Sequence, residues 1–125
     1  MPVRIELLEE ERLRVVLIEG AIGDADLYEA FSALWLAPDY DPGLDELIDL
    51  RGVTGLGVTS SGVQRLGETS VELHRGTPAV RVAIVAPDNL AFSLSRMDEA
   101  FVLESNSEYS VFRSLEEALS WLKRG

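Results

Sequence analysis

Serine, threonine and glycine are concentrated in one stretch of the sequence, RGVTGLGVTSSGVQRLG, residues 51 to 67. Residues of these types can cradle a phosphate, present a nucleophilic serine, accept a phosphate as a switch, or begin a helix. A Walker loop is not supported, because Val63 stands where a lysine must neutralise the phosphate charge. The G-x-S-x-G spacing of a hydrolase turn is missing. Gly55, Gly57 and Ser60 match a dinucleotide fingerprint, but only in part, because its third position needs Gly or Ala.

The chain has one histidine and no cysteine, which leaves few residues for catalysis. His74 lies near the C-terminal end of the helix that Ser60 and Ser61 are predicted to begin, roughly 20 Å away at about 1.5 Å per residue. We expect His74 to be partly exposed, at a position that the dipole at the helix C-terminus favours for histidine. The acidic residues lack the spacing of a calcium loop. The sequence therefore predicts a protein that is not an enzyme, with no cofactor and no bound metal.

The net charge is −11, from 11 basic and 22 acidic residues. Such a surface repels phosphate backbones, so we expect no nucleic-acid partner. No apolar run approaches the roughly 18 residues of a membrane span, and the N-terminus does not resemble a signal peptide. Together with the absence of cysteine, these features predict a cytoplasmic location.

The hydrophobic pattern predicts one domain over residues 1–125. Two alternating runs at 3–8 and 13–18 indicate a β-hairpin, and strands and helices then alternate. The further strands are LDELIDL, ending near Leu50, then AVRVAIVA and YSVF, and the helices begin at caps such as Asp24 and Asp88. The order ββαβαβαβα predicts an α/β fold: a mostly parallel five-stranded sheet with an N-terminal β-hairpin and about four helices.

Three consecutive hydroxyl residues precede a glycine where the second of these helices begins. One hydroxyl suffices to cap a helix, and Ser61 with Gln64 matches a capping box. Gly62 costs up to about 1 kcal/mol in a first turn, which indicates that something approaches the backbone closely there. Thr59, Ser60, Ser61 and Gly62 are therefore the candidate phospho-acceptor or partner-contact residues.

Residues 47–66, LIDLRGVTGLGVTSSGVQRL, resemble the signature of STAS domains, which have the SpoIIAA-like fold of anti-anti-sigma factors. Residues 52–54 match the turn of the signature, and residues 60–62 match the start of its helix. The order of elements is also similar to that of small bacterial STAS/CRAL-TRIO-like proteins over nearly the whole chain. The resemblance implies that Ser60 is phosphorylated by a partner kinase, although Thr59 stands where the family has an acidic residue.

Two apolar residues lie on the outer side of the helix predicted from Asp88 to Glu104. Phe92 and Leu103 lie opposite its apolar stripe, at about 100° per residue. They are either scattered exposed residues, part of a surface for a partner or for self-association, or the cover of a cavity for an apolar ligand. The resemblance supports the last alternative, because CRAL-TRIO relatives carry lipids in such a space.

Two functions follow from these features. The first is a non-catalytic regulatory binding module of the STAS type, which docks a protein partner through the 55–63 loop and the helix after it. The alternative is a carrier or sensor of a small apolar ligand or lipid.

Overall fold

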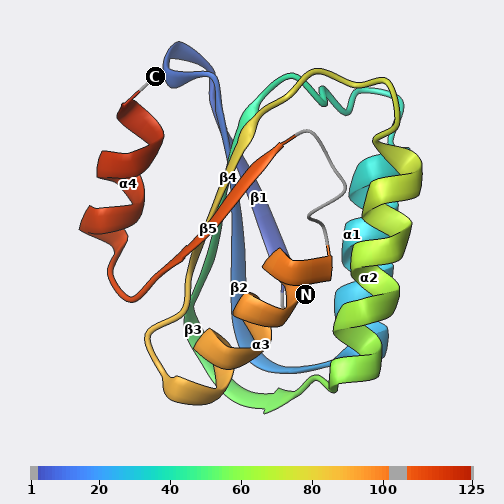
Figure 1. The fold of residues 1–125 in the computed structure, drawn as a ribbon, viewed down its shortest axis with the longest axis vertical. Coiled ribbons are helices and arrows are strands. Elements are labelled where there is room, and N and C mark those ends of the chain that lie inside the picture. Colours follow the sequence, from blue (N-terminus) through green and yellow to red (C-terminus); the bar gives the residue numbers. More distant parts are fainter. Residues whose placement is uncertain (1–2, 102–106, 125) are drawn as a thin grey trace.

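The computed structural model describes residues 3–101 and 107–124. Strands and helices follow one another in the predicted order (Figure 1): β1 (Val3–Leu8), β2 (Leu13–Gly23), α1 (Asp24–Leu36), β3 (Asp45–Gly57), α2 (Ser60–Leu73), β4 (Arg81–Val85), α3 (Asn89–Phe101), β5 (Glu108–Phe112) and α4 (Leu115–Lys123). A short 3-10 turn, η1 (Glu9–Glu11), closes the hairpin between β1 and β2. Within the described residues, no helix is long and apolar enough to cross a membrane.

The five strands form one sheet in the order β1-β2-β3-β4-β5. β1 is antiparallel to β2, and all the other neighbours are parallel. The helices α1, α2 and α3 lie on one face of the sheet, and α4 lies on the other (Figure 1). The predicted fold class is therefore confirmed, and the helices α1 to α3 all begin at the end of the sheet where the parallel strands finish.

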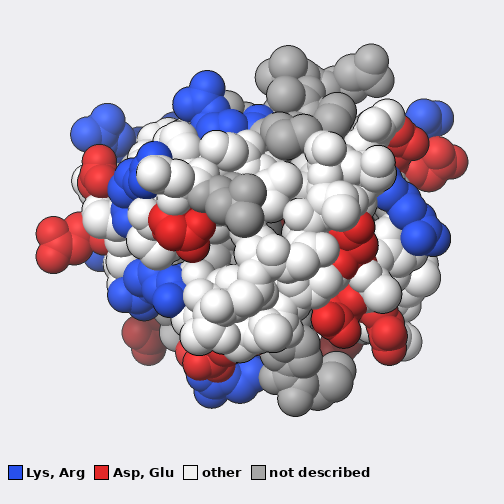
Figure 2. Space-filling view, turned by 90° about the horizontal axis from the view of Figure 1, so that it is seen from below, with Lys and Arg blue, Asp and Glu red and all other residues white. Residues whose placement is uncertain are grey.

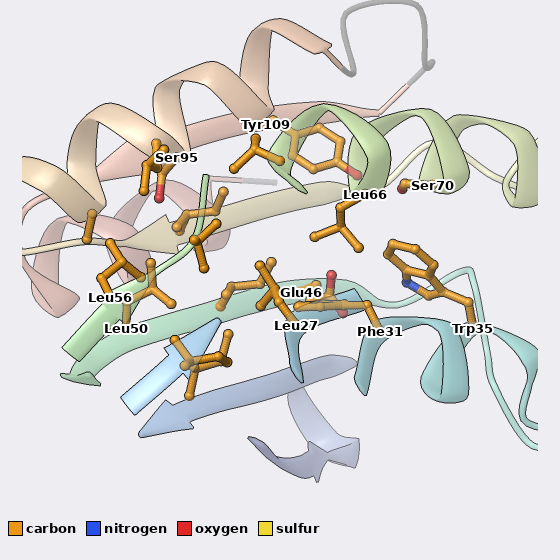
Figure 3. Close-up of a pocket in the computed structure, with 18 residues that line it drawn as sticks. Leu27, Phe31, Trp35, Glu46, Leu50, Leu56, Leu66, Ser70, Ser95 and Tyr109 are labelled. Carbon is orange, nitrogen blue, oxygen red and sulfur yellow. The ribbon is translucent and has the colours of Figure 1, made fainter. Parts of the chain in front are cut away.

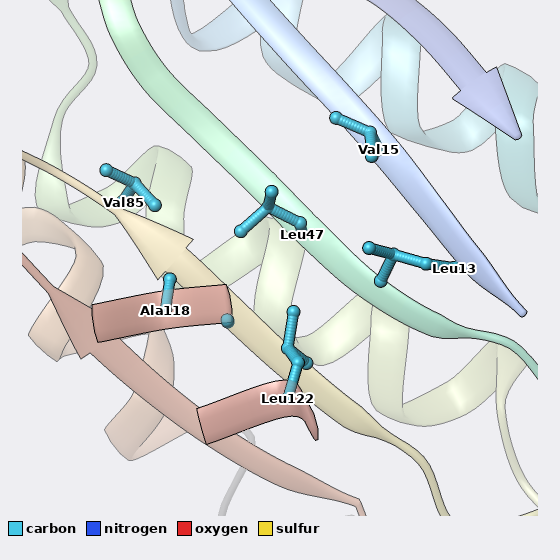
Figure 4. Packing of buried hydrophobic residues seen from close by; sticks show 7 residues of the cluster. Leu13, Val15, Leu47, Val85, Ala118 and Leu122 are labelled. Carbon is cyan, nitrogen blue, oxygen red and sulfur yellow. The ribbon is translucent and has the colours of Figure 1, made fainter. Parts of the chain in front are cut away.

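The two faces of the sheet are packed differently. On the α4 face, buried residues of three strands meet Ala118 and Leu122 in a closed cluster (Figure 4). On the other face, the central cluster contains Val16, Ile18, Ile22, Phe31 and Leu66. Here three helices must cover the sheet together, and the packing beneath them leaves a pocket.

β3 continues to Gly57 instead of ending near Leu50, so most of the predicted loop is a strand. Its last residues pair in parallel with the end of β2, from Glu19 beside Gly52 to Gly23 beside Gly57, with one register shift before this stretch and a second between Gly20 and Ala21. Glycine is needed for this close approach, because a Cβ atom on Gly52 would lie 2.8 Å from Cγ of Glu19. In the predicted 55–63 loop, only the two residues between the end of β3 and the start of α2 lie outside a strand or a helix.

Candidate functional site

The start of α2 is held by a residue of α1. Thr59 is the N-cap of α2, and its hydroxyl accepts a hydrogen bond from the Gly62 amide at 3.1 Å. Asp24, the first residue of α1, accepts two more: from the Thr59 amide at 2.8 Å and from the Thr59 hydroxyl at 2.6 Å. The two bonds from Thr59 lower the pKa of the Asp24 carboxyl, and partial burial opposes them. The carboxylate therefore binds at the positive end of the α2 dipole.

Gly62 makes room for this carboxylate. A Cβ atom at position 62 would overlap the carboxyl group of Asp24. The sequence predicted a close approach to the backbone at this point, and the approaching group is a side chain of the same protein. Asp24 also places an acidic group beside Thr59, where the STAS signature has an acidic residue in the sequence itself.

Two capping predictions in this region are wrong. Asp24 does not cap α1: Gly23 is the N-cap, and its amide donates to Asp26 Oδ2 at 3.1 Å. The Ser61 capping box does not form either, because Thr59 takes the N-cap position and the side-chain Nε2 of Gln64 donates to Glu68 Oε1. Ser60 and Ser61 are exposed, and their side chains make no hydrogen bond within the described residues.

A pocket of about 90 Å³ lies between the sheet and the helices α1, α2 and α3 (Figure 3). Its walls are mostly hydrocarbon: Ile18, Ile22, Leu27, Phe31, Trp35, Ile48, Leu50, Leu56, Val58, Val63, Leu66, Ile84, Ala91 and Leu94. Four polar side chains complete the lining: Glu46, Ser70, Ser95 and Tyr109. One of the alternatives for Phe92 and Leu103 was that they cover an apolar cavity. Phe92 is half-buried under the Arg113 guanidinium, 4.2 Å from its ring centroid, and does not line this pocket, and Leu103 lies outside the described residues.

A buried ion pair lies at one end of the pocket. Arg14 of β2 and Glu46 of β3 are register partners, and Arg14 Nε donates to Glu46 Oε1 at 3.0 Å. Arg14 also donates to the Asp41 carbonyl at 2.9 Å and to the Tyr40 hydroxyl at 3.3 Å. Burial raises the pKa of Glu46, and the charge and hydrogen bond of Arg14 oppose the shift. Burial, with the charge of Glu46, raises the pKa of Tyr40 to about 12.

His74 extends this cluster. Its Nε2 lies 2.7 Å from the Tyr40 hydroxyl, and its Nδ1 lies 2.7 Å from the Ser70 carbonyl oxygen. It is half-buried at the C-cap of α2, far from Ser60 at the other end of that helix. Among the residues that the structure describes, no group of three or more acidic or histidine side chains could hold a metal ion.

The sequence analysis missed the pairing of Arg14 with Glu46. A signal for it was present: Arg14 is the charged residue of the otherwise apolar run LRVVLI, and Glu46 is one of three acidic residues in the strand LDELIDL. Buried charges need partners, so two such residues on neighbouring strands predict an ion pair once the register is known.

Comparisons with known proteins identify the fold. No protein-family model and no curated protein sequence matches the chain. Among solved structures, it is similar to an uncharacterized protein of the DUF3478 family with a SpoIIAA-like fold from Shewanella loihica PV-4. The two are 24% identical with a TM-score of 0.59, over 96% of this chain and 91% of the other.

This chain has a SpoIIAA-like fold. The expected fold is thereby confirmed across nearly the whole chain, including the parallel sheet, the N-terminal hairpin and the four helices. A SpoIIAA-like fold does not define an activity, so the function has to be argued from the α2 start and the pocket.

Proposed function

We propose that this chain is a non-catalytic binding domain whose ligand is a small apolar molecule held between the sheet and α1 to α3. The observation that carries the proposal is the pocket, in which fourteen of the eighteen lining residues are apolar. Leaving a volume of 90 Å³ empty costs about 2 kcal/mol compared with a filled core. The closed cluster beneath α4 shows that the same chain packs tightly elsewhere.

The volume limits the size of the ligand. A cavity of about 150 Å³ is known to bind benzene, so 90 Å³ suits a smaller molecule. A lipid chain is too large for the pocket as it stands. The ligand class that fits best is a molecule of about three to four non-hydrogen atoms, since each water-sized volume is about 30 Å³ and the six carbon atoms of benzene take about 150 Å³.

Filling the pocket is expected to abolish binding without loss of stability. Ala91 of α3 is 1% exposed and lines the pocket, so Ala91→Val places methyl groups in the free space. We expect the affinity for small apolar probes, such as xenon, to fall at least tenfold, while the free energy of unfolding changes by less than about 1 kcal/mol. NMR titration of the amide resonances and urea denaturation measure the two quantities.

The matched control is Ala118→Val in α4. Ala118 is fully buried in the cluster beneath α4 and lines neither of the two pockets described. We expect this variant to lose about 1–3 kcal/mol of stability and to keep its affinity for the probes. Equal destabilisation by both substitutions, with no probe binding to the unchanged chain, would contradict the proposal.

A second candidate function is the docking of a protein partner at the start of α2. One observation favours it: Asp24 fixes the tip of α2 while Ser60 and Ser61 remain exposed. Figure 2 views the end of the molecule at which α1 to α3 begin, and its charged side chains lie mainly around an uncharged middle. Such a surface suits a protein partner of regulatory type, and Thr59, Ser60, Ser61 and Gly62 are the proposed contact or phospho-acceptor residues.

Ser60→Asp tests the docking candidate. A negative charge at this position is expected to weaken partner binding at least tenfold, through desolvation and repulsion, without changing the fold. Pull-down from the host with the unchanged chain and the variant measures the effect. Ser120→Asp on the opposite face, also exposed, is the control and is expected to bind normally. A partner retained equally by both variants, or none at all, counts against docking at this site.

A further inference from the structure

The carboxylate of Glu46 faces the pocket without a complete set of hydrogen-bond donors. Glu46 is 6% exposed, and its side chain lines the apolar pocket (Figure 3). Arg14 donates to its Oε1, and within the described residues no donor bonds its Oε2. Among the described side chains, Ser32 Oγ is the fully enclosed polar atom without a partner, so Glu46 Oε2 is not fully enclosed and can accept a hydrogen bond from a ligand.

Arg14 balances the charge of Glu46 from outside the pocket. Its guanidinium is held by Glu46, the Asp41 carbonyl and the Tyr40 hydroxyl, and it stacks 4.4 Å from the Tyr40 ring centroid. Arg14 is absent from the pocket lining but lines a smaller pocket of about 30 Å³ on the other side of Glu46. The ion pair is therefore neutral as a unit and presents a hydrogen-bond acceptor to the larger pocket.

The polar side chains are gathered at one end of the pocket. Trp35, Glu46, Ser70 and Tyr109 line both the large and the small pocket, so they form the wall between them. Three of the four polar residues of the large pocket belong to this wall, and the remaining surface is almost entirely hydrocarbon. A ligand that fits must have a single polar group at one end of an apolar body.

The polar group of the ligand is a neutral donor. An ammonium group would add an unpaired positive charge to an ion pair that is already balanced, in apolar surroundings. A carboxylate would be repelled by Glu46. A hydroxyl group donates one hydrogen bond to the ionised carboxylate and adds no charge.

We propose that the pocket binds a compact neutral alcohol of about three to four non-hydrogen atoms, whose hydroxyl donates to the Glu46 carboxylate. The inference rests on the proposed function, because it names the ligand class of the same pocket. Burial raises the pKa of Glu46 against the charge and hydrogen bond of Arg14, and a bound hydroxyl that donates to the carboxylate would lower this pKa.

Four matched probes test the inference by NMR titration of the intact chain. They are propan-1-ol, its isomer methoxyethane, propan-1-amine as the ammonium ion, and acetate, each with about four non-hydrogen atoms. The ether has the same atoms as the alcohol but no donor. We expect the alcohol to bind about tenfold more tightly than each of the other three, the size of one hydrogen bond to a charged group. Its resonance shifts should centre on the pocket-lining residues.

Replacing the carboxylate should remove this preference. Glu46→Gln keeps the shape of the side chain but leaves Arg14 without its ionic partner and can impair folding. The second variant, Arg14→Met with Glu46→Gln, removes both charges and avoids that problem. In either folded variant, the alcohol and the ether are expected to bind within about twofold of each other.

The outcomes separate the inference from the proposed function. If the alcohol and the ether bind the unchanged chain equally, or the ammonium binds most tightly, the assignment of a neutral alcohol is overturned while the apolar-ligand function stands. If neither these probes nor xenon bind, the proposed function fails, and the inference fails with it.

Discussion

Arg14→Met is expected to lower the free energy of unfolding by about 3–5 kcal/mol at pH 7, because it leaves the Glu46 carboxylate buried and unpaired. The side chains of Arg14 and Glu46 are 4% and 9% exposed, so water cannot replace the lost partner. Chemical denaturation measures the loss. The double variant Arg14→Met with Glu46→Gln is expected to recover much of it, because no unpaired charge remains.

The destabilisation by Arg14→Met should depend on pH in a defined direction. The folded-state pKa of Glu46 is raised above its ordinary value of 4.5, and removing the positive charge raises it further. A group with a raised pKa contributes stability that is present below its unfolded value and is lost as the pH rises through the folded value. The cost of the substitution should therefore be smallest at pH 4 and grow toward pH 7. A cost below about 1 kcal/mol that does not change with pH would contradict the buried-pair description.

Gly62→Ala is expected to destabilise the chain by about 1–2 kcal/mol, although alanine is the better helix former. The added Cβ atom displaces the Asp24 carboxylate, and the two hydrogen bonds from Thr59 are lost. When Asp24 has already been replaced by alanine, the same Gly62→Ala change should stabilise the chain by up to about 1 kcal/mol. Denaturation of the four proteins of this double-mutant cycle measures the reversal of sign.

The ionisation of Asp24 provides an independent check. Its folded-state pKa is lowered from 3.8 by the bonds from Thr59, so its contribution is present above that value and is lost as the pH falls through the folded value. The destabilisation by Gly62→Ala should therefore shrink in acid. If alanine at position 62 stabilises the chain whether or not Asp24 is present, the carboxylate does not occupy the start of α2.

The order of strands and helices could be predicted because each core element has its own periodic pattern. The alternating runs at the N-terminus, the apolar run before Pro87 and the Ser114 start of α4 all gave elements that the structure confirms. The Glu117 amide, for example, donates to the Ser114 hydroxyl at 3.2 Å. These signals are local, so each of them can be recognised in the sequence without knowledge of the contacts that its element makes with the rest of the chain.

The end of β3 and the contacts of Asp24 could not be predicted in this way. Residues 52–57 form a strand because the end of β2 pairs with them, while their glycines are typical of a turn. Asp24 and Thr59 are 35 residues apart, and their contact depends on α1 and α2 beginning side by side. The pocket depends on how three helices cover one face, which no single segment encodes.

The Asp24 carboxylate at the start of α2 has a consequence for the response of the chain to dissolved anions. Because it is tethered, it competes there with an effective concentration in the millimolar range or above. Free phosphate or sulfate at similar concentrations would have to displace it from the Thr59 amide and hydroxyl. Small inorganic anions therefore do not readily displace Asp24 from the start of α2. An anion binds at this helix start only when the anion is covalently attached to the chain or belongs to a docked macromolecule.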